Sequence, residues 1–149
     1  MAPALTLEFL VLTVWAGILA TYVHMVLALW APRYGLPRLD FAAAMADLCF
    51  GDAFDGAPPY WLGLMALHFN GVVFALFYAT LAGPLLPGPL FIRGLIWGGI
   101  LFFGSQLMFV PLFLRKGVFG LKDHPRAWMT ALVAHGAFGA VLGWLCPVL

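Results

Sequence analysis

Long apolar runs separated by short polar segments dominate the chain. Each run is free or nearly free of ionised side chains, and each reaches the length of about 20 residues that a helix needs to cross a bilayer. The runs span residues 7–30, 60–81, 91–114 and 128–148. Backbone groups in lipid must bond within their own segment, and no run alternates like a barrel strand. The pattern therefore predicts an all-α membrane protein, a four-transmembrane-helix bundle in a single transmembrane domain over residues 1–149.

The first polar segment contains a short amphipathic pattern of its own. Asp40 is a good N-cap residue, and apolar side chains at helical spacing follow it, from Phe41 to Cys49. We expect a short interfacial helix over residues 40–50. Four carboxylates lie in or beside it, and because they are widely spaced they favour a solvated rim over a metal site. They are Asp40, Asp47, Asp52 and Asp55.

The second and third predicted helices are joined by a short, proline-rich link, "GPLLPGPLFIRG". A link of this length predicts an antiparallel hairpin. The third helix contains Pro111 about one turn from its end, where it removes a backbone hydrogen bond and should kink the helix. Ser105 and Gln106 are the polar groups best placed to compensate there.

A weak repeat relates the two halves of the chain. "HMVLALWAPRYGLPRLD" and "LMFVPLFLRKGVFGLKD" share a helix end, basic residues, a glycine and a final aspartate. Each segment precedes a helix in which a histidine is followed by a glycine. The similarity suggests a parallel repeat of two helix pairs, related by an axis along the membrane normal.

The composition strengthens the membrane interpretation and excludes another class. The sequence is 64% hydrophobic and only 9% charged, whereas about a quarter of the residues of a soluble domain are charged. The bilayer is therefore the expected partner. The net charge of +1 and the lack of a basic, aromatic-rich patch argue against a nucleic-acid partner.

The basic residues predict the orientation. Six of the seven fall in the two longer loops, and the exception is Arg93. The six are Arg33, Arg38, Arg115, Lys116, Lys122 and Arg126. By the positive-inside rule both loops lie in the cytoplasm, so both termini are expected to be periplasmic.

Three histidines fall at a common depth within the predicted helices. At 1.5 Å per residue, His24, His68 and His135 each lie roughly 10–12 Å from the cytoplasmic ends. Ionisable side chains at such depth usually face a bundle interior, a cavity or a ligand. We expect His68 and His135 to point inward and to face one another or a shared ligand, with His24 near the pair but dispensable.

The histidine layer has three interpretations. The simplest is packing, in which a neutral imidazole bonds a neighbouring helix and glycines allow close approach. On this view Gly139 and Gly143 form an interface, while Leu142 between them faces lipid. The second is a b-type haem held by His68 and His135, with Gly71 and Gly139 leaving a flat patch beside each histidine.

The third interpretation is a copper site or a path for protons or a small solute. Thioether and imidazole groups together suit Cu(I), and methionines lie near the histidines. The candidate ligands are His24, Met25, Met65, His68, Met108 and His135. Passage of protons or a small solute would use the same histidine layer and would need an oligomer to build a pore.

Several motifs together resemble a known family. They are "YGLPRLDFAAAMADLCFG", "HFNGVVFALFYATL", "LPGPLFIRGLIWGGILFFGSQLMFVPLF", "GVFG" and "HGAFGAVLGWL". From Thr21 to Leu145 the chain is similar to a family of uncharacterised small bacterial four-helix integral membrane proteins. The resemblance implies the fold and a bacterial inner-membrane location, and no established activity. Similar sequences lack a histidine in the segment that corresponds to "TYVHM", so His24 departs from the pattern.

The leading functional expectation is a non-enzymatic subunit or accessory protein of a membrane complex, packed against itself or a larger partner. The sequence contains no nucleophile–base arrangement, phosphate-binding loop or paired intramembrane carboxylates. The alternatives are the haem-binding electron-transfer protein and the copper or proton and small-solute passage described above.

Overall fold

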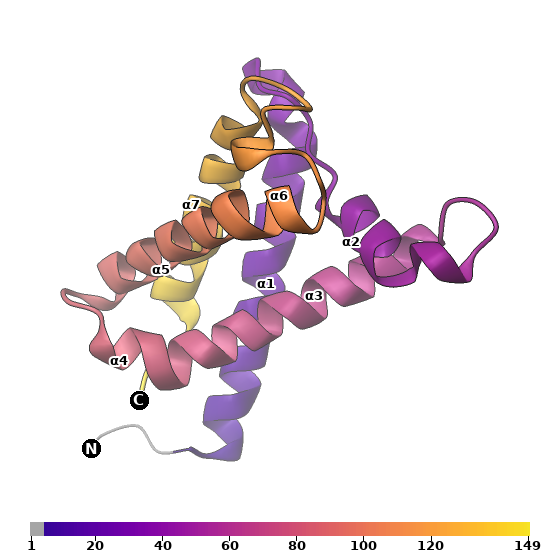
Figure 1. The fold of residues 1–149 in the computed structure, drawn as a ribbon. Coiled ribbons are helices and arrows are strands. Elements are labelled where there is room, and N and C mark those ends of the chain that lie inside the picture. The colour runs from indigo at the N-terminus through magenta and orange to yellow at the C-terminus, as the bar shows by residue number, and fades with distance from the viewer. Residues whose placement is uncertain (1–4) are drawn as a thin grey trace.

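The computed structural model describes residues 5–149 and is all-α over that range. Four of its helical segments are long and apolar enough to cross a membrane, which confirms the predicted four-helix membrane architecture. They are Leu7–Tyr34, Tyr60–Leu85, Leu90–Leu112 and Ala127–Leu145. Figure 1 shows the first helix as the long axis of the molecule, with the last helix running beside it and the second and third segments crossing obliquely.

The first spanning segment begins and ends at recognisable signals. The Thr6 hydroxyl accepts a hydrogen bond from the Phe9 amide at 3.1 Å, which caps α1 (Leu7–Trp30). A 3₁₀ turn, η1 (Ala31–Tyr34), continues the helix. Gly35 then stops it in the left-handed conformation, with φ 73°, where glycine carries no steric penalty.

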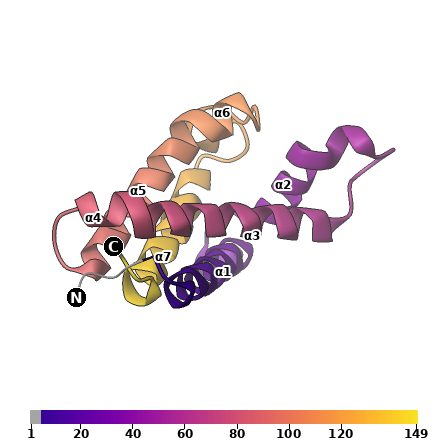
Figure 2. The same cartoon turned by 90° about the horizontal axis from the view of Figure 1, so that it is seen from below.

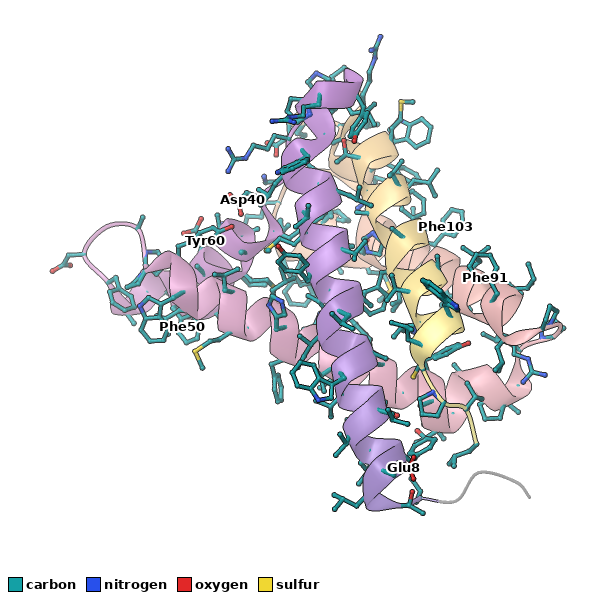
Figure 3. The ribbon with its side chains drawn as sticks, turned by 180° about the vertical axis from the view of Figure 1, so that it is seen from behind. Glu8, Asp40, Phe50, Tyr60, Phe91 and Phe103 are labelled. Carbon is teal, nitrogen blue, oxygen red and sulfur yellow. The ribbon has the colours of Figure 1, made fainter. Side chains whose placement is uncertain are left out.

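The short helix predicted in the first loop is present as α2 (Phe41–Phe50), followed by the 3₁₀ turn η2 (Gly51–Ala53). The Asp40 carboxylate accepts from the Ala43 amide at 3.0 Å and so caps the helix as predicted. The same carboxylate accepts from the Tyr60 hydroxyl at 3.0 Å, and Figure 3 shows the two side chains close together. α2 is thereby fixed to the start of α3 (Tyr60–Phe77).

Two of the spanning segments widen into a π-helical turn just before a proline. α3 continues through η3 (Tyr78–Ala82) into α4 (Gly83–Leu85), which contains Pro84. α5 (Leu90–Gly104) continues through η4 (Ser105–Phe109) into α6 (Val110–Leu112), which contains Pro111. Proline lacks an amide hydrogen and its ring clashes with the carbonyl four residues earlier, and a wider turn accommodates both defects.

The polar residues expected to compensate at Pro111 bond within their own helix. The Ser105 hydroxyl donates to the Phe102 carbonyl at 3.0 Å, and the Gln106 side-chain amide donates to the Ser105 hydroxyl at 3.2 Å. Beyond α6 the chain turns through η5 (Val118–Gly120) and enters the last helix, α7 (Ala127–Leu145).

The helices pack in series, in the order α5, α7, α1, α3 and α2. α5 and α7 approach most closely through two facing glycine pairs, Gly94 with Gly98 and Gly139 with Gly143. A β-carbon added to Gly143 would lie 2.8 Å from the Leu90 carbonyl oxygen, and one added to Gly139 would lie 3.0 Å from the Gly98 α-carbon. The backbones of α5 and α7 are therefore in contact, as expected of small residues at this spacing.

A second small-residue interface joins α1 to α3. A β-carbon added to Gly17 would lie 2.9 Å from Ala75, and one added to Gly71 would lie 3.0 Å from the β-carbon of Thr21. Each predicted helix pair thus packs closely through glycine. The twofold relation between the pairs remains a prediction.

The predicted hairpin of the second and third spanning helices differs from the structure in its packing. α3 and α5 are close only near their link, where the Trp97 ring stacks on Phe77 with centroids 5.9 Å apart. Beyond that point they diverge, as Figure 2 shows. Each helix follows its own glycine-lined partner, α1 for α3 and α7 for α5, so the two are drawn apart.

Leu142 was expected to face lipid, and that prediction is wrong. Its side chain is fully buried, in a core that also contains Phe9, Ala75, Tyr78 and Trp97. α7 lies between α5 and α1 in the series and packs on both. A residue between two glycines of such a helix therefore still faces a neighbour.

Candidate functional site

The divergence of α3 from α5 leaves a cavity of about 470 Å³. α1 and α7 contribute His24 and His135 to its lining, α3 contributes Asn70 and Phe74, and the segment from α5 to α6 forms the opposite wall. Its volume is in the range of small-molecule sites, about 300–1,000 Å³. Four residues that line it are also exposed on the surface, so the cavity opens sideways between the helices. They are Ile100, Gly104, Met108 and Phe113.

The cavity is apolar apart from a small group of neutral polar side chains. These are Thr21, His24, Asn70, Ser105, Gln106 and His135. No Asp, Glu, Lys or Arg is among the described residues that line it. A mostly apolar wall with a few placed hydrogen-bonding groups is the usual composition of a ligand site.

Two histidines from different helices meet in this cavity. The rings of His24 on α1 and His135 on α7 pack edge to face, with centroids 4.8 Å apart and planes at 89°. Phe41 at the start of α2 stacks on His24, with centroids 4.5 Å apart, and also lies edge to face with His135 at 6.4 Å. Phe138, one turn beyond His135, also contacts His24, at 6.2 Å. Three helices thus fix the position of the His24 ring.

The hydrogen bond of His135 defines what this ring offers to the cavity. Its Nδ1 lies 2.8 Å from the Ala131 carbonyl oxygen one turn earlier. A carbonyl can only accept, so Nδ1 carries the hydrogen and Nε2 of the neutral ring is an acceptor. The described residues provide no hydrogen donor to this Nε2.

His24 and Gln106 are also left with hydrogen-bonding capacity. His24 is 8% exposed, and neither of its ring nitrogens bonds a described residue. Gln106 is 3% exposed, and its amide nitrogen donates to Ser105 while its oxygen has no described donor. Among the described residues only Trp97 Nε1 is a fully buried polar side-chain atom without a partner, so the unpaired atoms of His24, Gln106 and His135 remain accessible from the cavity that these residues line. Polar groups of a ligand in the cavity would complete their hydrogen bonding.

His68 lies apart from this arrangement. Its Nδ1 is 2.9 Å from the Leu64 carbonyl oxygen on its own helix, and the residue is not among those that line the cavity. α3 turns Leu67, Asn70 and Phe74 toward the cavity, so the intervening His68 lies on an adjacent face. The histidine pair in the structure is therefore His24 with His135, in place of the predicted facing of His68 and His135.

The two glycines that were expected to lie beside a haem, Gly71 and Gly139, are both covered by neighbouring helices. Thr21 occupies the surface of Gly71, and the backbone of α5 covers Gly139, so neither glycine offers a free patch to a macrocycle. The edge-to-face contact of His24 and His135 leaves no space for a flat ring between them. Haem ligation by His68 and His135 remains a prediction without a geometric argument in its favour.

The candidate copper ligands are dispersed. Met25 packs in a separate core cluster with Ala42 and Leu67. Met65 and Met108 are 63% and 62% exposed on α3 and η4. Among the described residues, no group of three His, Cys, Asp or Glu side chains is placed to hold a metal ion. Only Met108 of these methionines lines the cavity with the histidines.

The sequence predicted the layer of His24 but not its pairing with His135, and it did not predict the contact of Phe41 with His24. The depth of His24 was a sufficient signal for its place near His135. The position of Phe41 directly after the α2 cap did not predict its contact with His24, because that contact depends on how α2 folds back against the bundle.

No protein-family model matches the chain, and neither a curated protein nor a solved structure is similar to it. The resemblance to a small bacterial four-helix family therefore stays a prediction. Fold and site together define an all-α, multi-pass membrane protein with a side-opening cavity among its helices.

Proposed function

We propose that this protein binds a neutral, lipid-soluble small molecule that enters its cavity from the bilayer. The observation that carries the proposal is the group of incompletely bonded polar side chains at His24, Gln106 and His135, inside an otherwise apolar cavity. Polar groups in a membrane interior are costly when unpaired, and functional sites are the usual place for them. A ligand with a polar head and an apolar body would bond the polar side chains and fill the apolar remainder of the cavity.

The opening of the cavity suits entry from the membrane. Ile100 and Met108 belong to the spanning segment Leu90–Leu112 and are exposed where they border the cavity. A molecule dissolved in the hydrocarbon core would meet this opening directly. Binding of such a molecule is compatible with the expected accessory role, in which the protein holds a ligand for a membrane complex or a second copy.

We propose the bacterial inner membrane as the location, with both termini in the periplasm. An even number of spanning segments supports both ends of the chain lying on the same side. The six loop cations support the assignment of the other side to the cytoplasm. A C-terminal reporter that is active only in the cytoplasm would contradict this orientation if it gave a signal.

The binding proposal is tested by filling the cavity. A β-carbon at Gly104 or at Gly99 meets nothing within 4 Å, and only Gly104 lines the cavity. Gly104→Phe should therefore fill the site, while Gly99→Phe is the matched control on the same helix. The probe is a long-chain alcohol that carries a photoreactive diazirine, added to purified protein in detergent.

We expect peptides of α5, η4 and α7 that border the cavity to be labelled in the wild type and in Gly99→Phe. Labelling there should fall at least about tenfold in Gly104→Phe, because the added ring occupies the space. Equal labelling of both variants, or labelling spread evenly over the exposed helix faces, would remove the cavity as the site.

A further inference from the structure

We infer that the ligand is a quinol, the reduced form of a lipid-soluble quinone, held by hydrogen bonds from its hydroxyl groups. This inference rests on the proposed function and specifies the chemistry of the head group. It concerns binding alone. Three features of the cavity point to it: its hydrogen-bond acceptors, its lack of charge and its aromatic rings.

The unpaired acceptors favour a quinol, although the cavity also holds unpaired donors, the N–H of His24 and the amide of Asn70. His135 Nε2 is an acceptor because Nδ1 donates to the Ala131 carbonyl, and the Gln106 side-chain oxygen is an acceptor by its chemistry. Neither has a described donor, and both residues line the cavity. Each hydroxyl of a quinol can donate to one of these acceptors and also accept from the His24 N–H or the Asn70 amide. A quinone could only accept from those donors, and it would leave His135 Nε2 and the Gln106 oxygen without a partner.

The lack of charged side chains in the cavity excludes phosphate and amine, the commonest lipid head groups. A phosphate would need Arg, Lys or a helix N-terminus to offset its desolvation. The described lining contains no cationic residue, and it also contains no carboxylate for an amine. The head group that fits is therefore uncharged.

The aromatic residues favour a flat ring over an aliphatic alcohol. Phe41 stacks on His24 at 4.5 Å, and Phe74, Phe109 and Phe138 also line the cavity. Aromatic rings interact favourably with one another in stacked and edge-to-face arrangements, beyond the burial of their surface. The open side between α3 and α6 leaves an exit for the chain of the quinol into the bilayer.

The test compares three ligands that share one ring and one tail. They are a decyl-substituted benzoquinol, its quinone, and the dimethyl ether of the quinol, which has no hydroxyl donor. Binding is measured by equilibrium dialysis against the purified protein, without oxygen and with a reductant in the quinol samples. We expect the quinol to bind about tenfold more tightly than either analogue, as the loss of one or two hydrogen bonds implies.

Two variants locate the preference. His135→Phe keeps an aromatic ring and removes the acceptor, so the preference should fall to about threefold or less. His68→Phe makes the same change outside the cavity and should keep the wild-type preference. The wild-type comparison of the three ligands stands even if His135→Phe does not fold.

The outcomes separate this inference from the proposal beneath it. The quinol inference would be wrong if the quinone or the dimethyl ether bound as tightly as the quinol. It would also be wrong if His135→Phe kept the wild-type preference. If decanol bound as tightly as the quinol and its binding was lost in Gly104→Phe, the quinol inference would fail and the cavity would remain a lipid site without ring recognition. If none of these ligands bound, both the inference and the proposed function would fail.

Discussion

The two ends of the α3–α5 pair differ in how their helices are held. At the link end, Trp97 packs against Phe74, Phe77 and Tyr78, and the Tyr78 hydroxyl donates to the Leu90 carbonyl at 3.2 Å. At the other end the same helices diverge around His24 and His135. One end is closed by packed aromatic rings, with Trp97 Nε1 buried without a partner among the described residues, and the other is open and lined by several polar side chains.

The difference shows how a small chain can combine stability with a binding site. Glycines allow α7 to pack closely against α5, and α3 against α1. These two contacts hold the helices together, so the fold does not depend on contact between α3 and α5 at the open end. The unpaired polar groups of the cavity lower stability without disrupting these helix contacts. Variants at the closed end should change stability, and variants at the open end should change binding.

The largest loss of stability is expected from inserting a side chain into the α5–α7 contact. Gly139→Leu places a branched side chain against the backbone at Gly98, where an added β-carbon would already lie 3.0 Å from the α-carbon. Helix backbones cannot give way as a side chain can, so we expect a loss of about 3 kcal/mol or more. Thermal unfolding in detergent measures it.

The control for this variant lies on the same helix. A β-carbon at Gly136 meets nothing within 4 Å, so Gly136→Leu should melt within a few degrees of the wild type. Similar melting temperatures for Gly136→Leu and Gly139→Leu would contradict a backbone contact between α5 and α7.

A smaller loss is expected at Leu142, which the structure places in the core of the closed end. Leu142→Ala leaves a cavity between α7 and its neighbours and should cost about 2 kcal/mol. Leu145→Ala is the matched control, because Leu145 is 44% exposed and should tolerate the change. Equal melting temperatures would return Leu142 to the lipid-facing position that the sequence suggested.

At the open end the sign should reverse. Gln106 is buried with an oxygen that no described residue satisfies, so Gln106→Leu should be neutral or should stabilise the protein by up to about 1 kcal/mol. The same variant should weaken quinol binding, since one acceptor is lost. Such an exchange of function for stability is typical of binding sites. A clear drop in melting temperature would show that Gln106 is structural.

Hydropathy and cap residues were sufficient to predict the elements of this fold. Asp40 marked the start of α2, and the apolar runs marked four spanning segments close to their observed bounds. The arrangement of those helices was harder to predict. Every face of an apolar helix is hydrophobic, so the sequence does not distinguish a lipid-facing leucine from Leu142, or a cavity-facing histidine from His68.

Depth along a helix was predictable, whereas rotation about its axis was not. His24, His68 and His135 share a layer by residue count, and only the rotation of α3 separates His68 from the other two. Gly71 and Gly139 were recognised as small-residue positions. Which neighbour fills each of them depends on helix order, which the short links leave open.

The smallest expected change in stability tests this separation directly. His24→Met and His68→Met replace a half-polar ring with a flexible side chain of similar size, and each should change the free energy of unfolding by less than about 1 kcal/mol. The His24 variant loses stacking on Phe41, and the His68 variant loses a hydrogen bond to its own helix. Each loss is a modest contribution to stability. Quinol binding separates the two variants, because only His24 lies in the cavity beside His135. We expect severalfold weaker binding for His24→Met and unchanged binding for His68→Met, measured by the same dialysis assay. The opposite result would mean that α3 presents His68 to the ligand, and the histidine pair of the site would then be the one that the sequence predicted.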